Sequence, residues 1–291
     1  MNKGYIAAFS AYFWWGLSPI YWKLISSIPA EEILAVRVLL SLPFLLIILL
    51  ITKNFHTFKS DLTNLSKIKP YILSAFLLAT NWYIFIWAMN NNHVVEASLG
   101  YFINPLVNVL MGVILLGERM RRMQWLSIIL AFGGVMYLAI NYGQFPWIAL
   151  VLAVSFAGYG FIRKTASLGA ISGLTGEMTV LLLPAFGLLG FLAVNTDFMI
   201  PSLGWDMHFL LSLTAIVTIV PLVVFAYGAR RIPYSTLGLI QYIAPSMQFL
   251  LGVFLYNEDF NQERLIGFSF IWAALFIYTA ENIYFMKRKP S

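Results

Sequence analysis

The sequence predicts an all-α integral membrane protein with ten transmembrane helices, arranged as two inverted five-helix repeats. Composition, the distribution of the basic residues and an internal repeat lead to this prediction. Of the 291 residues, 60% are hydrophobic and 10% are charged, and the mean hydropathy is +0.82. Soluble domains carry charges on about a quarter of their residues. At about 20 residues per span, ten helices leave about 90 residues for loops and tails, which excludes a soluble catalytic domain.

Apolar runs between Gly, Pro and charged residues give the expected spans in chain order. The first half supplies 4–23, 33–52, 70–90, 95–116 and 122–141, and the longest polar stretch separates its second run from its third. The second half supplies 145–162, 171–193, 207–228, 233–256 and 264–286. The run 171–193 is the least regular of the ten, because it is rich in Gly and contains Glu177 and Pro184.

The basic residues alternate between the loops. With the N-terminus in the cytoplasm, 15 of the 18 Lys and Arg residues fall in cytoplasmic loops or tails, and the opposite side holds only Lys23 and Arg264. This asymmetry is what the positive-inside rule predicts for ten spans with both termini cytoplasmic. A nucleic-acid partner is not expected, because the charges follow every second loop instead of clustering on one surface.

Two segments repeat at an offset of 140 residues. Residues 103–118 (INPLVNVLMGVILLGE) align without gaps on 243–258 (IAPSMQFLLGVFLYNE), with seven of 16 positions identical, including Pro105 with Pro245. The halves 1–142 and 143–291 therefore each hold five spans, and an odd number of spans inverts the second copy in the membrane. Inverted repeats are common in secondary transporters, whose substrate site lies between the repeats near the midplane.

The most specific motifs are EASLGYFINPLVN at 96–108, LGER at 116–119 and RRMQW at 121–125. With these motifs the chain resembles, over nearly its whole length, the RarD family of the EamA group in the drug/metabolite transporter superfamily. The resemblance implies a multi-pass permease of the bacterial cytoplasmic (inner) membrane, built from two EamA-like repeats. The resemblance specifies the architecture better than the substrate, because substrates across this superfamily are diverse.

The matched prolines give the first candidate site. Pro105 and Pro245 are expected to interrupt their helices and to free the carbonyl groups of Tyr101 and Gln241. Interrupted helices in corresponding positions of two halves indicate a binding site. The alternative is a pair of kinks that improve packing, with the amides bonded to neighbouring helices. The polar and aromatic side chains near these breaks are Tyr101, Asn104, Asn108, Gln241, Tyr242 and Gln248.

Aromatic and ionisable residues add further candidates. Trp14, Asn81 and Trp82 are expected in the substrate pathway, or alternatively packed against lipid or helices. Ionisable groups inside a membrane suggest a function. Arg37 is expected to contact substrate, and Glu177, which matches Arg37 at the repeat offset, to act in coupling or as a gate; both are shallow enough to pair with loop charges instead.

The sequence therefore predicts a secondary-active permease for a small organic solute, such as a metabolite, an amino-acid-like compound or a drug. It is expected to work by alternating access around a midplane cavity between the fourth and ninth helices. No cofactor is expected, because the chain has no phosphate-binding loop. The carboxylates Glu258, Asp259 and Glu263 lack a second acidic motif to complete a metal site. The alternative is a membrane-embedded enzyme or a non-transporting receptor.

Overall fold

The computed structural model is a bundle of α-helices, described for residues 3–91, 93–167, 169–195, 198–256 and 262–288. No strand occurs in these ranges. Nine segments of this described part are long and apolar enough to cross a membrane. The helices of the first half are α1 (Lys3–Leu24), α2 (Ala30–Ile51), α3 (Phe55–Leu62), α4 (Leu65–Asn90), α5 (Val94–Leu116) and α6 (Arg122–Tyr142).

Within the described residues, the second half holds seven α-helices, because two of its expected spans are divided. They are α7 (Trp147–Thr165), α8 (Ala170–Asn195), α9 (Trp205–Ser212), α10 (Thr214–Ala229), α11 (Tyr234–Gln241), α12 (Ile243–Leu255) and α13 (Gln262–Arg288). A short 3-10 helix, Ile200–Ser202, precedes α9. α1 has 22 residues but lies outside the nine apolar segments. Its six Tyr and Trp residues lower its hydropathy, although such rings are suited to membrane interfaces.

Local signals fix several helix ends. The Asn64 side chain accepts a hydrogen bond of 3.1 Å from the Ser66 amide and so caps the start of α4. Gly117 and Gly143 end α5 and α6 with φ values of 63° and 76°, a left-handed conformation that glycine adopts without strain. The polar stretch expected between the second and third spans contains the short helix α3.

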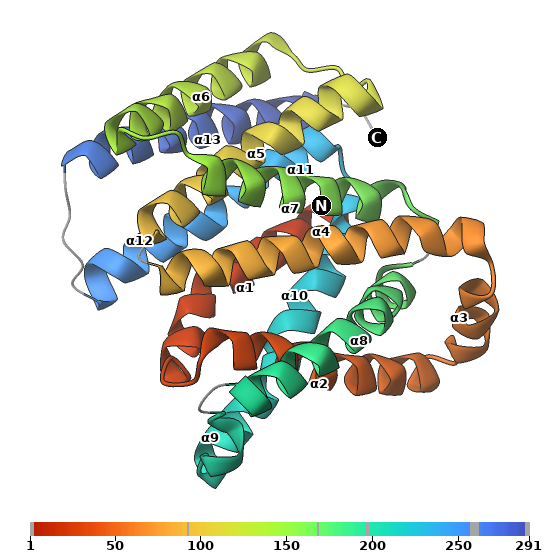
Figure 1. Cartoon of the computed structure of the whole chain (residues 1–291). Helices are drawn as coiled ribbons and strands as arrows, with labels where there is room; N and C mark the ends of the chain where they lie inside the picture. Colours follow the sequence, from red (N-terminus) through yellow and green to blue (C-terminus); the bar gives the residue numbers. More distant parts are fainter. Residues whose placement is uncertain (1–2, 92, 168, 196–197, 257–261, 289–291) are drawn as a thin grey trace.

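The most extensive helix contacts join the first half of the chain to the second. α6 packs on α13, α5 on α7, α2 on α8 and α1 on α10. Figure 1 shows α6 beside α13 at one edge of the bundle and α2 beside α8 at the other.

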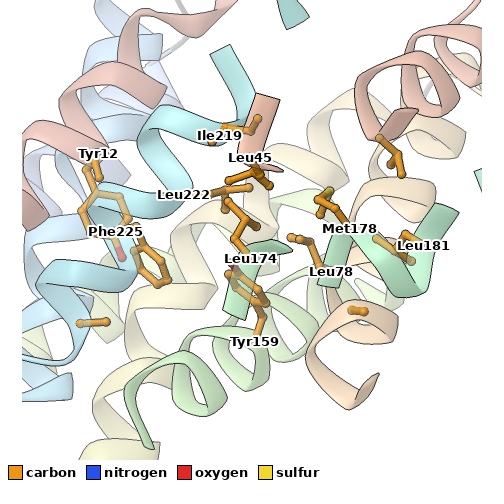
Figure 2. Close-up of a cluster of buried hydrophobic side chains, with 14 of the residues drawn as sticks. Tyr12, Leu45, Leu78, Tyr159, Leu174, Met178, Leu181, Ile219, Leu222 and Phe225 are labelled. Atoms are coloured by element: carbon orange, nitrogen blue, oxygen red, sulfur yellow. The ribbon is translucent and has the colours of Figure 1, made fainter. Parts of the chain in front are cut away.

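The largest apolar cluster lies where α1, α2, α4, α7, α8 and α10 meet. Figure 2 shows its labelled side chains converging from these helices, with Tyr12 beside Phe225 and Leu78 beside Met178. The outer surface carries large apolar side chains instead of charges. Ile114, Leu183 and Phe276 are 71%, 80% and 75% exposed, which is the pattern of a lipid-facing surface.

Candidate functional site

A cavity of about 970 Å³ lies inside the bundle, between helices of both halves. Its walls come chiefly from α1, α2, α4, α5, α10 and α12. Ligand pockets of this size are typically apolar with a few placed polar groups. The aromatic part of the wall is formed by Tyr12, Trp15, Trp22, Trp82, Phe85, Tyr101, Phe102, Phe156, Phe249, Tyr256 and Phe268.

The cavity reaches the surface at the turn between α1 and α2. Lys23, Ser26 and Ser27 belong to its lining and are exposed. The Lys23 ammonium lies 3.6 Å from the centre of the Tyr256 ring, so a cation–π contact joins the ends of α1 and α12 at this mouth.

A chain of hydrogen bonds forms the inner end of the cavity. Oε1 of Gln241 accepts from the Tyr12 hydroxyl at 3.2 Å and from Nδ2 of Asn108 at 2.8 Å. Nδ2 of Asn108 also lies 3.3 Å from Oδ1 of Asn104, whose own Nδ2 donates to the Ala153 carbonyl at 2.5 Å. These five residues connect α1, α5, α7 and α11, so four helices are fixed at one point by side chains that are all nearly inaccessible.

Arg37 lies deeper than its sequence position suggests, because α2 begins at Ala30. It is about 10 Å along the helix axis from the first residue of α2. Its guanidinium carbon is 3.7 Å from the centre of the Trp82 ring, and both side chains line the cavity. The Arg37 side chain therefore presents a flat, stacked cation to the cavity.

The two matched prolines lie differently in their helices. α11 ends at Gln241 and α12 begins at Ile243, which places the interruption at the residues whose carbonyl groups Pro245 affects. α5 runs without interruption from Val94 to Leu116, through Pro105. Pro105 thus lies within a continuous helix, and Pro245 lies three residues after Tyr242, the one residue between α11 and α12; a binding site at paired breaks stays a prediction.

The cavity brings together part of the predicted set. Arg37, Asn81, Trp82, Tyr101, Gln241, Pro245 and Gln248 line it. All three of their amides also bond to neighbouring helices: besides Gln241, Nδ2 of Asn81 donates to the Leu152 carbonyl at 2.9 Å, and Nε2 of Gln248 donates to the Trp15 carbonyl at 3.0 Å. The same side chains therefore line the cavity and hold neighbouring helices together.

Other predicted residues lie outside the lining. Trp14 is 38% exposed on the outer face of α1, and its neighbour Trp15 faces the cavity. The Tyr242 hydroxyl donates to the Phe102 carbonyl at 3.2 Å. Asn104, Asn108 and Pro105 lie behind the wall. One cavity residue that the sequence did not indicate is Thr218, because a threonine in an apolar run commonly bonds to its own helix.

Glu177 lies away from the cavity in a buried polar cluster. Its carboxylate accepts from the Ser74 hydroxyl at 2.6 Å, from Nη1 of Arg163 at 3.4 Å and from the Tyr159 hydroxyl at 3.5 Å. Glu177 is 0% and Arg163 1% exposed. Arg163 is one of the 15 basic residues expected in cytoplasmic loops or tails, but it lies in the last turn of α7 and joins α7 to α8.

Glu118, the last residue of the first repeated segment, caps the start of α11. Its carboxylate accepts from the backbone amides of Tyr234 and Ser235 and from the Ser235 hydroxyl. Its repeat counterpart Glu258 and the neighbouring Asp259 lie outside the described residues. The described part of the chain holds no group of three or more His, Cys, Asp or Glu residues placed to bind a metal ion.

Comparison with known proteins confirms the resemblance found in the motifs. Residues 2–140 match the model of the EamA-like transporter family. Protein RarD of Streptomyces exfoliatus is 46% identical over 278 residues, which cover 96% of this chain and 88% of the relative. Protein RarD of Salmonella typhimurium is 45% identical over 290 residues, with coverage of 99% and 98%. A transporter of Bacillus subtilis, YojE, is 39% identical over 294 residues, with coverage of 100% and 98%.

A solved crystal structure that is 17% identical superposes with a TM-score of 0.71 over 96% of this chain and 98% of the other chain. That likeness shows a shared helical fold. The relatives, in contrast, are alike in sequence along nearly their whole length, and YojE is named a transporter. The chain belongs to the RarD family of EamA-like membrane transporters in the drug/metabolite transporter group.

Proposed function

We propose that this protein is a secondary-active permease that moves a small organic solute across the bacterial inner membrane by alternating access. The observation that carries the proposal is the cavity of about 970 Å³. It lies between the two halves of the chain, reaches the surface at one end and ends at the Gln241 network at the other. A site of this form is accessible from one side of the membrane at a time.

The pattern of helix contacts supports two inverted five-helix repeats, 1–142 and 143–291. In this arrangement α1, α2, α4, α5 and α6 correspond to α7, α8, α9–α10, α11–α12 and α13. The contact of α1 with α10 then has a counterpart in α7 with α4, and that of α1 with α12 in α7 with α5. The contacts α2–α8 and α6–α13 each join two corresponding helices, so they stay the same when the two repeats are exchanged. A pseudo-two-fold axis in the membrane plane produces such an exchange, with α1 as the tenth span.

The charge distribution supports an orientation with both termini in the cytoplasm. α3 carries Lys59, and the loops that follow α5 and α10 carry Arg119 and Arg230. The mouth at the turn between α1 and α2 then faces away from the cytoplasm. The described conformation would be the outward-facing member of the transport cycle.

In this orientation the cluster around Glu177 closes the cytoplasmic side. Ser74 comes from α4 in the first repeat, and Glu177 and Arg163 come from the second, so the cluster joins the repeats. Opening towards the cytoplasm would separate α4 from α8 and expose the Arg163–Glu177 pair to water. Glu177 is thus proposed as part of an inner gate.

Uptake by proteoliposomes tests the permease. Purified protein is reconstituted and loaded with a mixture of unlabelled solutes, and influx of labelled metabolites is compared with that into protein-free vesicles. We expect saturable influx of at least one solute, abolished by Trp15→Ala. Binding without influx of any bound solute would support a receptor instead, and conversion of the solute would support an enzyme.

A further inference from the structure

Arg37 differs from the other buried or half-buried arginines of the bundle. Arg163 has the Glu177 carboxylate at 3.4 Å, and Arg121 has the Glu281 carboxylate at 3.0 Å. Arg37 makes no ion pair and no hydrogen bond with any described residue, and its Nε is buried without a partner. A cation in this position normally pairs with an acidic group, because a membrane interior disfavours an unpaired charge.

The surroundings of Arg37 favour an anion with a planar head. Trp82 stacks on one face of the guanidinium at 3.7 Å, and Trp22 lies 6.0 Å away. Stacking fixes the plane of the group and leaves its N–H edge free. That edge donates two parallel hydrogen bonds to a carboxylate in the geometry that makes such pairs strong.

Two further polar groups of the cavity lack partners within the described chain. The Thr218 hydroxyl of α10 is buried and unbonded. Gln241 uses Oε1 to accept two hydrogen bonds, but no hydrogen bond is made by its Nε2. Both residues line the same cavity as Arg37. A hydroxyl and an amide are suited to a second, uncharged polar group on a ligand.

The charged and apolar residues that line the cavity limit the net charge and the body of the ligand. The charged side chains among the described lining residues are Lys23 and Glu31 near the mouth and Arg37 in the interior. One interior cation matches one negative charge and is too little for a polyphosphate. Trp15, Phe156, Phe249 and Phe268 provide an apolar surface for the ligand body.

We propose that the cavity binds amphipathic organic monocarboxylates, with the carboxylate on Arg37 and an aromatic or branched apolar body against the aromatic wall. This substrate class rests on the proposed permease function. The carboxylate would accept hydrogen bonds from the Arg37 guanidinium, and the free donors of Thr218 and Gln241 would contact the polar groups of the body.

A matched set of small probes tests the carboxylate directly. 3-Phenylpropionate, 3-phenylpropionamide and 3-phenylpropylamine share one body and differ in the head group, and 4-methylpentanoate with its amide repeats the comparison without a ring. Binding to the wild-type protein in nanodiscs is followed by quenching of tryptophan fluorescence. We expect the acids to bind at least about tenfold more tightly than their amides, with the amines weakest.

Variants then assign the effect to Arg37. Arg37→Gln should weaken acid binding by about 10- to 100-fold and leave amide binding unchanged. Arg37→Lys keeps the charge but loses the planar fork, so it should recover part of the affinity. The matched control is Arg231→Gln, because Arg231 also stacks on an aromatic ring, 3.4 Å from the centre of Tyr227, but is exposed outside the cavity.

Equal binding of acids and amides, preferred binding of the amines, or absence of binding by every acid would overturn the carboxylate assignment. These outcomes need only the wild-type protein, so they hold even if an Arg37 variant fails to fold. Uptake of a neutral or cationic solute by the same preparation would then still support the permease function. Arg37-dependent binding of acids that never enter proteoliposomes would support the carboxylate assignment and contradict the permease function.

Discussion

The buried pair of Arg163 and Glu177 makes a quantitative prediction about stability. Arg163→Met removes the cation and leaves the carboxylate with two hydroxyl donors, from Ser74 and Tyr159. Breaking a buried pair in this way costs about 3–5 kcal/mol, because a charge is left uncompensated. At about 2–4 °C per kcal/mol, Tm should fall by about 6–20 °C.

Replacing both partners distinguishes the contribution of the ion pair from the cost of leaving one charge unpaired. Arg163→Met combined with Glu177→Met leaves no buried charge, and an apolar replacement of a buried pair is typically close to neutral. The double variant should therefore melt within about 5 °C of the wild type, far above either single variant. Thermal unfolding is followed in detergent by tryptophan fluorescence, because the chain has nine Trp residues and no Cys for thiol-reactive dyes.

Arg121→Met serves as the control. Arg121 pairs with Glu281 at 3.0 Å, but its side chain is 40% exposed. A pair with such exposure contributes about 1 kcal/mol or less. The reasoning is refuted if Arg163→Met and Arg121→Met shift Tm equally, or if the double variant is as unstable as Arg163→Met alone.

Three further predictions use matched substitutions. Gly238→Ala places a Cβ 2.6 Å from a backbone carbonyl oxygen of α5, so it should lower Tm, whereas Gly133→Ala, which meets nothing within 4 Å, should not. Gln241→Leu removes the acceptor of two buried donors and should destabilise by about 2–6 kcal/mol, measured by the same unfolding assay. Trp15→Ala should abolish solute binding measured by thermal shift, and Trp14→Ala should leave it unchanged, because Trp15 lines the cavity and Trp14 does not.

Each of these comparisons has an opposite outcome that would count against it. Equal Tm values for the two glycine variants would mean that α5 and α11 separate without loss. A stable Gln241→Leu protein would show that the network at the inner end of the cavity contributes little. Loss of binding in the Trp14 variant alone would place the solute on the lipid side of α1.

The apolar runs were enough to predict the helices, but not which face of each helix points inward or which helices pack together. Trp14 and Trp15 are adjacent and α1 is apolar on every face, so no periodicity shows which ring faces inward. Asn104 was indistinguishable from a substrate ligand because its acceptor, the Ala153 carbonyl, lies in the other half of the chain. Such partners follow from the packing of α5 on α7, which sequence spacing does not reveal.

Prolines and glycines carried a partial signal. Pro245 lies one turn after the boundary between α11 and α12, whereas Pro105 is accommodated within one helix. The Gly-rich run that made 171–193 irregular has a spatial reason. A Cβ at Gly173 would overlap the Arg163 guanidinium, so the missing side chain leaves room for the buried cation.

The close contact of α1 with α10 has a consequence for how the chain is made. A Cβ at Gly228 would lie 2.9 Å from the Ala8 amide nitrogen and 3.2 Å from the Gly4 carbonyl oxygen, so the two backbones touch. Synthesis proceeds from the N-terminus, so α1 is made long before α10 exists. Its contact face must meanwhile be covered by lipid or by an insertion factor. Nascent chains stalled after α6 should therefore be sensitive to membrane proteases, and resistance should appear only once the second half has been translated.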